Sequence, residues 1–242
     1  MLVRLTDRDP RTLVELAGDL GRDPELDDLD PDDLAVHKPR RGEAPLWDFP
    51  DGTLHRREVA AHLVGVALGW DLVPTTVLRE DGPFGPGSLQ RFVAHDPEHH
   101  YFHLLEHGDD HVLDQLRRMV VFDLVIDNAD RKGGHVLLAE ARDLPDGRVH
   151  GEVRLVDHGV SFHVEHKLRT VAWHLVGEPI PDEGRAAAAG LRPQLDGPLG
   201  EELARLLSPP ELTALRTRAA VVGDLDRFPE PTGHHPYPWP LL

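Results

Sequence analysis

A loop at residues 127–135 contains the side chains most able to do chemistry. An apolar stretch precedes the sequence Asp-Asn-Ala-Asp-Arg-Lys-Gly-Gly-His, and a second apolar stretch follows it. Phosphoryl-transfer enzymes place a catalytic Asp five residues before a metal-binding Asn, in a loop of this kind. Asp130 precedes His135 by the same interval. We therefore predict Asp130, Arg131 and Lys132 as catalytic residues and His135 as a metal ligand. The alternative is that the acidic residues only cap a helix end and a turn.

Asp157 is a second acidic residue at the end of an apolar run. It follows Val-Arg-Leu-Val and precedes His158-Gly159. Kinases hold divalent metal with an Asp that ends a strand and is followed by one residue and Gly. We predict that Asp157 holds metal, and the alternative is an ordinary turn before a glycine.

Lysine is rare in this chain, which makes each lysine position informative. Of 26 basic residues only three are lysine: Lys38, Lys132 and Lys167. A compact ammonium differs from a planar guanidinium in what it can bind. Kinases pair a strand lysine, which anchors ATP phosphates, with a glutamate on the next helix. Lys38 and Glu58 occupy such positions; the alternative is a surface lysine and a glutamate favoured in a first helical turn.

The hydrophobic pattern predicts the elements that position these residues. Val59, Leu63 and Val66 recur at helical spacing, with Thr53 as a possible cap and Gly69 as a stop. Alternating or short apolar runs bounded by turn residues predict strands. We expect strands at 34–37, 70–78, 88–93, 136–139 and 153–156, and helices at 55–68, 111–126, 168–175, 199–207 and 210–222.

Two stretches carry a family resemblance. Residues 122–131 (FDLVIDNADR) and 155–162 (LVDHGVSF) resemble the catalytic and metal loops of type II phosphatidylinositol 4-kinases. Residues 37–77 resemble an actinobacterial, phosphatidylinositol 3-/4-kinase-like group. The resemblance implies that ATP binds with Mg²⁺ or Mn²⁺ and that phosphate is transferred to a hydroxyl. It also implies the following roles: Lys38 on phosphate, Glu58 paired with Lys38, Asp157 on metal, Asp130 at the acceptor, and Gln90, Phe92 and Val93 beside the adenine.

The implied fold class is α+β, with the two lobes of a protein or lipid kinase. Residues 1–93 would form a small, strand-rich lobe with one helix that binds nucleotide. Residues 94–242 would form a larger, mostly helical lobe with the catalytic and metal loops. The phosphate acceptor stays open, as a small molecule or a protein.

The amino-acid composition limits which kinds of site and partner the protein can have. The 242 residues include no cysteine, which excludes disulfides, thiolate zinc sites and cysteine nucleophiles. A net charge of −17 disfavours nucleic acid and anionic membrane surfaces. No apolar run reaches about 18 residues and no signal pattern opens the chain. We therefore expect a cytoplasmic protein without stable membrane insertion.

Two features leave alternatives open. His135 stands where kinases use Asn, and residues 22–33 are strongly acidic where a phosphate-covering loop is expected. These features favour a pseudokinase that binds a nucleotide or a partner with little turnover.

Four histidines spaced by four would form one stripe if the segment were a continuous helix, which would suit zinc. They are His99, His103, His107 and His111, and a solvated loop is the alternative.

Overall fold

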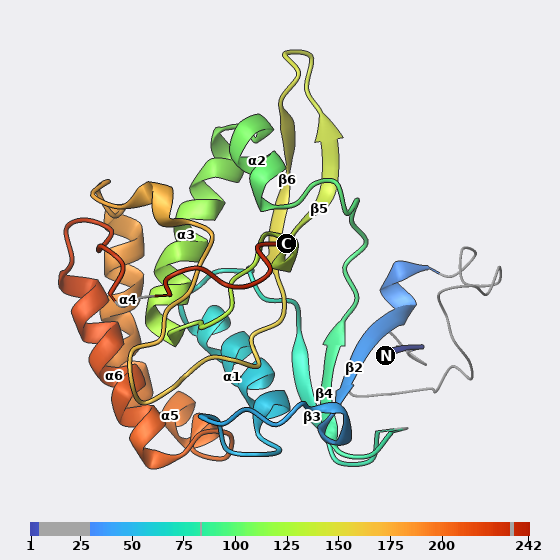
Figure 1. The fold of residues 1–242 in the computed structure, drawn as a ribbon, viewed down its shortest axis with the longest axis vertical. Coiled ribbons are helices and arrows are strands. Elements are labelled where there is room, and N and C mark those ends of the chain that lie inside the picture. The colour runs from blue at the N-terminus through green and yellow to red at the C-terminus, as the bar shows by residue number, and fades with distance from the viewer. Residues whose placement is uncertain (5–29, 83, 233–234) are drawn as a thin grey trace.

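The computed structural model describes residues 1–4, 30–82, 84–232 and 235–242, and it has a mixed α+β architecture (Figure 1). Most of the acidic segment, residues 22–29, lies outside the described residues. The strands are β1 (Leu2–Arg4), β2 (Leu34–Pro39), β3 (Thr76–Arg79), β4 (Gly87–Arg91), β5 (Val136–Asp143) and β6 (Val149–Leu155). The helices are α1 (Leu54–Ala67), α2 (Tyr101–His107), α3 (Asp110–Ile126), α4 (Asp182–Leu195), α5 (Pro198–Leu203) and α6 (Pro209–Asp224).

Four strands form an antiparallel sheet in the order β1-β2-β4-β3. The register places Lys38 opposite Ser88 and Val36 opposite Gln90. Successive side chains of a strand point to opposite faces. Val36 and Lys38 therefore share one face of the sheet.

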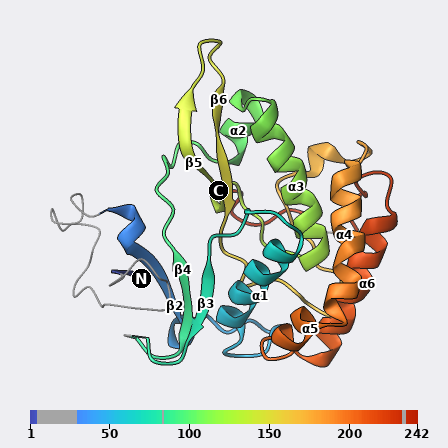
Figure 2. The same cartoon turned by 180° about the vertical axis from the view of Figure 1, so that it is seen from behind.

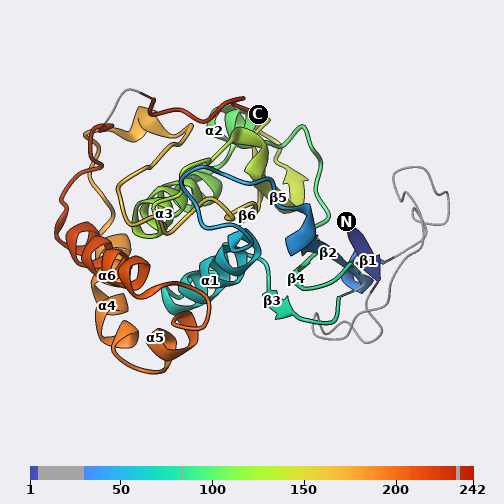
Figure 3. The same ribbon diagram turned by 60° about the horizontal axis from the view of Figure 1, so that its bottom comes forward.

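Helix α1 lies between this sheet and the helices of the C-terminal half, as Figures 1 and 3 show. Small and β-branched side chains on α1 are buried, among them Ala60, Ala61 and Val64. The helix ends before Gly69, whose φ of 77° suits glycine. Strands β2 and β4 and helix α1 confirm the predicted strands 34–37 and 88–93 and the predicted helix 55–68. The predicted strand 70–78 is shorter in the structure, where only β3 forms.

The long helix α3 packs on the β5–β6 hairpin, which Figure 2 shows from behind. Every residue of α3 from Met119 to Ile126 is buried. Gln115 fastens the two elements, since its amide donates to the Gly151 carbonyl (3.1 Å) and accepts from the Val153 N–H (2.9 Å). The helix and hairpin predicted at 111–126, 136–139 and 153–156 are confirmed, with longer strands.

The predictions for the C-terminal third are only partly correct. The predicted helix 168–175 is wrong, because only a 3₁₀ turn at Trp173–Leu175 forms. Helix α4 was not predicted, although Gly184, Ala188, Leu191 and Leu195 form its buried face. Helix α5 confirms the predicted helix 199–207 in shorter form, and α6 confirms the predicted helix 210–222 and extends it at both ends. Among the described residues, no helix is long and apolar enough to cross a membrane.

A buried ion pair connects α1 to α6. The Arg57 guanidinium donates to the Glu211 carboxylate, and both side chains are at most 8% exposed. Glu211 also accepts from the Ser208 N–H and hydroxyl, which caps α6. Breaking a buried pair is costly because it leaves the other charge unpaired in a medium of low dielectric constant.

We predict that Glu211→Gln lowers the free energy of unfolding by about 3 kcal/mol, because it leaves the Arg57 charge uncompensated while keeping an oxygen for the cap. Urea unfolding measures this change. The exposed Glu202 is a matched control, and Glu202→Gln should change stability by less than about 0.5 kcal/mol. Equal effects of the two substitutions would contradict the prediction.

Candidate functional site

Lys38 reaches two carboxylates from the end of β2. Its ammonium donates to Glu58 Oε1 at 2.6 Å and to Asp157 Oδ1 at 3.1 Å. Burial alone would lower the pKa of Lys38, but the Glu58 and Asp157 charges outweigh burial and raise it. Lys38 therefore stays protonated. The structure thus brings together the predicted Lys38–Glu58 pair and the predicted metal residue Asp157.

Glu58 lies on α1 and is almost fully buried. Its second oxygen, Oε2, accepts from the His158 N–H at 3.0 Å. Burial would raise the pKa of Glu58, yet the Lys38 ammonium and the His158 N–H hold it far below its ordinary range. The ionised carboxylate therefore fixes the Lys38 ammonium against the chain that follows β6.

Asp157 follows β6 and adopts a left-handed backbone conformation with φ of 62°. Such a φ is uncommon for a residue other than glycine and marks a sharp change in chain direction. The side chain is 54% exposed, and Oδ2 lies 3.3 Å from His135 Nε2. One carboxylate oxygen therefore faces Lys38 and the other faces His135.

His135 is a neutral imidazole in this arrangement. Burial lowers its pKa to about 4, although the Asp157 charge acts in the opposite direction. Nδ1 accepts from the Lys132 N–H at 3.5 Å, which assigns the remaining ring proton to Nε2. The protonated Nε2 then faces the Asp157 carboxylate at 3.3 Å. His135 thus orients Asp157, and it could ligate metal through Nε2 only after a change of tautomer.

Asp130 and Lys132 lie on the loop that joins α3 to β5. Their side chains form an ion pair of 3.0 Å and are 29% and 20% exposed. Burial raises the pKa of Asp130 and the Asp157 charge adds to the rise, while Lys132 opposes it. Asn128 fixes the loop, because its side-chain oxygen accepts from the Asp130 N–H at 2.9 Å.

Arg131 lies inside the protein, so the prediction that it is catalytic needs correction. The side chain is 0% exposed, and its Nε and Nη2 atoms donate to the Asp123 carboxylate at 2.9 and 3.0 Å. Nη1 donates to the carbonyls of His135 and Val156. Nη2 also donates to His158 Nε2 at 2.9 Å. Arg131 is a positioning residue that holds the 127–135 loop and the end of β6 together.

Two residues of this network, Asp123 and His158, were not predicted from the sequence. Asp123 is a charged residue in the otherwise apolar end of α3, and that break in the pattern was the available signal. His158 is fully buried between Arg131 and Glu58, and burial lowers its pKa. Neither residue can touch a ligand, but both complete the network behind the exposed groups.

Within the described part of the chain, none of the three predicted adenine contacts lines the cavity at Lys38. Gln90 is buried, and its side-chain amide donates to Thr76 Oγ1 at 2.9 Å, which holds β3 to β4. Phe92 and Val93 line a cavity of about 450 Å³ with Arg154 and other residues. The cavity at Lys38 is a different one.

Two adjoining cavities lie near Lys38. The first, of about 450 Å³, is lined by Lys38, Glu58 and Asp157 among other residues. The second, of about 670 Å³, is lined by Arg40 and Arg41 among other residues, and it shares Glu43, Ala44 and Leu54 with the first. The two linings together contain the basic side chains Lys38, Arg40 and Arg41 and the carboxylates Glu43, Asp51, Glu58 and Asp157, so carboxylates outnumber the basic groups there.

The C-terminal segment packs against the 127–135 loop, and its end lies at the base of the β5–β6 hairpin (Figure 1). The Gly133 N–H donates to the Leu241 carbonyl at 2.7 Å. A Cβ at Gly133 would lie 2.9 Å from the Phe102 ring, so a larger residue there would require Phe102 to move. Trp239 itself is 87% exposed.

No family model matches the chain. Protein Rv2133c of Mycobacterium tuberculosis is 46% identical to it over 238 aligned positions, which cover 86% of this chain and 82% of the relative. The chain belongs to the Rv2133c family. The name Rv2133c describes no ligand or reaction.

His135 gives the metal-free protein a defined pH dependence. Its pKa is about 4 in the folded chain and 6.5 in an unfolded one. Between these values the unfolded chain binds a proton that the folded chain does not, so stability falls as the pH falls. At 1.36 kcal/mol per pKa unit, the free energy of unfolding falls by about 3 kcal/mol in total. Above pH 6.5 His135 causes no such loss.

We predict that this loss is absent from His135→Asn. Urea unfolding of EDTA-treated protein from pH 7 to pH 4 would measure it as the difference between wild type and variant. His95→Asn, which removes an exposed imidazole, serves as the control and should follow the wild type. Parallel pH profiles for wild type and His135→Asn would disprove the assignment.

Proposed function

We propose that this protein is a phosphotransferase that uses ATP and Mg²⁺ or Mn²⁺ and acts on a hydroxyl of a small molecule or a protein. The observation that carries the proposal is the convergence of Lys38, Glu58 and Asp157. Lys38 and Asp157 are 119 residues apart, yet their charged groups meet beside a cavity. A strand lysine, a helix glutamate and an acidic residue behind a hairpin are the phosphate and metal residues of kinases.

The proposal extends to a two-lobed, kinase-like arrangement. The first lobe, residues 1–93, would contain the four-stranded sheet and α1 and bind nucleotide. The second, residues 94–242, would contain the β5–β6 hairpin, the two loops and the remaining helices. The order of strand lysine, helix glutamate, Asp130 loop and Asp157 along the chain supports this division and the resemblance to phosphatidylinositol 3-/4-kinases.

The residues at Asp157 fit a divalent metal. An exposed carboxylate is an oxygen ligand that Mg²⁺ and Mn²⁺ accept, and the neutral His135 adds no positive charge. Bound metal would neutralise charge on the β- and γ-phosphates. Lys38 would hold phosphate oxygens, and Glu58 would keep its ammonium in place.

Asp130 and Lys132 would act on the acceptor. Asp130 would orient the acceptor hydroxyl and accept its proton, and its raised pKa suits a group that must bind a proton. Lys132 would pair with the negative charge that develops on the transferred phosphoryl group. The strongly negative chain disfavours an anionic lipid acceptor, despite the family resemblance, and a nucleic acid acceptor as well.

A second candidate is a pseudokinase that binds nucleotide or a partner with little turnover. The direct ion pair between Lys38 and Asp157 favours it. In this pair the ammonium that phosphate would need is bound to Asp157, and the carboxylate that metal would need is bound to Lys38. The imidazole of His135 beside Asp157 favours it too, since kinases have an oxygen ligand at that position.

Nucleotide binding is the first test. We predict that ATP with Mg²⁺ or Mn²⁺ at about 100 times its Kd stabilises the protein by about 2.7 kcal/mol, which raises Tm by about 5–10 °C for a chain of this size. Lys38→Met and Asp157→Asn should abolish the rise, because they remove the phosphate and metal contacts. Asp224→Asn, an exposed change on α6, should retain it. Differential scanning fluorimetry measures the shift, and no shift with any nucleotide and metal would refute the phosphotransferase and favour a pseudokinase that binds a partner.

Turnover separates the two candidates. We predict that the protein consumes ATP with metal and that Asp130→Ala reduces kcat by at least about 100-fold, the usual contribution of a general base. The same variant should keep the ATP-induced rise in Tm, because Asp130 does not touch Lys38. ATP binding without any Asp130-dependent consumption would favour the pseudokinase.

A further inference from the structure

The histidine-rich segment does not form the single stripe that its spacing suggested. His103 lies between His99 and His107, with ring centroids 5.0 and 4.6 Å away. His111 instead belongs to the first turn of α3, beyond Gly108, and its ring stacks on His150 of β6 at 4.9 Å. The segment is therefore divided between two surroundings.

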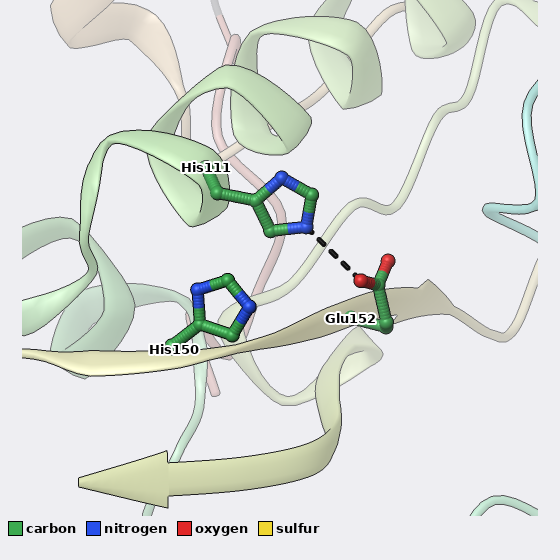
Figure 4. Close-up of side chains that lie close together, drawn as sticks. All are labelled: His111, His150 and Glu152. Carbon is green, nitrogen blue, oxygen red and sulfur yellow. Dashed lines mark hydrogen bonds and ion pairs between the residues drawn. The ribbon is translucent and has the colours of Figure 1, made fainter. Parts of the chain in front are cut away.

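His111, His150 and Glu152 form a cluster on the outer face of β6 (Figure 4). One nitrogen or oxygen of each residue lies within 4.8 Å of the others. His111 Nε2 is 3.0 Å from Glu152 Oε1. The burial of β6 alternates, so His150 and Glu152, two residues apart, point to the same face. Within the described residues this is the one group of three such side chains that could share an ion.

A second observation indicates that His150 is prepared to bind a cation. Its Nδ1 donates to Asp109 Oδ2 at 2.6 Å, which leaves the lone pair on Nε2 free. Metal-binding histidines usually donate their other N–H to a carboxylate, which fixes the tautomer and makes the ligand nitrogen more basic. The arrangement at Asp109 and His150 has this form.

The backbone fixes the same region. Asp109 caps α3, because its Oδ1 accepts from the Val112 N–H at 3.0 Å. The Asp109 N–H donates to the Val149 carbonyl at 3.0 Å, which attaches the start of α3 to the start of β6. His111 and His150 are therefore held on two elements whose relative position is set by other contacts.

We propose that His111, His150 and Glu152 bind a divalent ion of the zinc class, with Asp109 orienting His150. Two imidazoles and one carboxylate suit Zn²⁺, and the partly exposed cluster leaves a fourth position for water. Tetrahedral Zn²⁺ with ligands at about 2.0–2.1 Å needs ligand atoms about 3.4 Å apart. The His111–Glu152 pair is already closer than this at 3.0 Å. A ligand atom of His150 lies within 4.8 Å of both, so side-chain rotation would complete the set.

This site is independent of the proposed phosphoryl-transfer site. It connects the start of α3 to the outer face of the hairpin, whereas Asp157 lies beyond the other end of β6. A bound ion adds a link between α3 and β6 next to the contacts of Gln115. Mg²⁺ does not replace it, because imidazole is a poor ligand for Mg²⁺.

Zinc binding to the EDTA-treated full chain tests the proposal, with isothermal titration calorimetry at neutral pH and Co²⁺ absorption as a probe of coordination. We expect one Zn²⁺ per chain. His111→Ala and His150→Ala should weaken binding at least 100-fold, and Glu152→Gln at least 10-fold. Asp109→Asn still caps α3, and it should weaken binding about 10–100-fold as the loss of an orienting carboxylate does.

His103→Ala is the matched control, since it removes one histidine from the neighbouring group and should leave affinity unchanged. Circular dichroism of each variant verifies that it is folded. The proposal is overturned if the wild type binds no zinc, or if His150→Ala binds with full affinity. A loss of binding in His103→Ala with normal binding in His111→Ala would overturn it as well, because it would place the ion on the other histidines.

Discussion

The rest of the site depends on the ion pair and hydrogen bonds of the buried Arg131 guanidinium. Burying a charge is costly unless ion pairs and hydrogen bonds satisfy it. Asp123 supplies the opposite charge, and the carbonyls of His135 and Val156 accept two further hydrogen bonds. Because these acceptors belong to α3, to the 127–135 loop and to the end of β6, the guanidinium can be satisfied only when all three segments are in place.

The same network continues to the surface through His158 and Glu58. His158 accepts from Arg131 with its ring and donates to Glu58 with its backbone N–H. Glu58 then holds Lys38, which also contacts Asp157. Under the proposed function, metal and nucleotide would help each other to bind. A cation on Asp157 weakens its attraction for Lys38, and the released ammonium becomes available for phosphate.

Elements with a strong hydrophobic periodicity were predicted from the sequence, and elements with a weak one were not. Helix α3 and the hairpin carry long apolar patterns, and both were found. Helix α4 was missed because two of its four buried positions are Gly184 and Ala188, whose small side chains give little signal. The Lys38–Glu58 pair could be anticipated from a strand and the helix that follows it. The roles of Asp123 and His158 depend on tertiary packing that no local pattern shows.

The neighbouring residues Asp130, Arg131 and Lys132 show why a motif alone could not assign roles. Lys132 has extended backbone, with φ of −89° and ψ of 163°. Extended backbone sends alternate side chains to opposite sides. Asp130 and Lys132 accordingly meet on the outer side at 3.0 Å, while Arg131 enters the interior and is 0% exposed. The direction of each side chain, rather than its place in the motif, decides which residues can reach a ligand and which can only position the others.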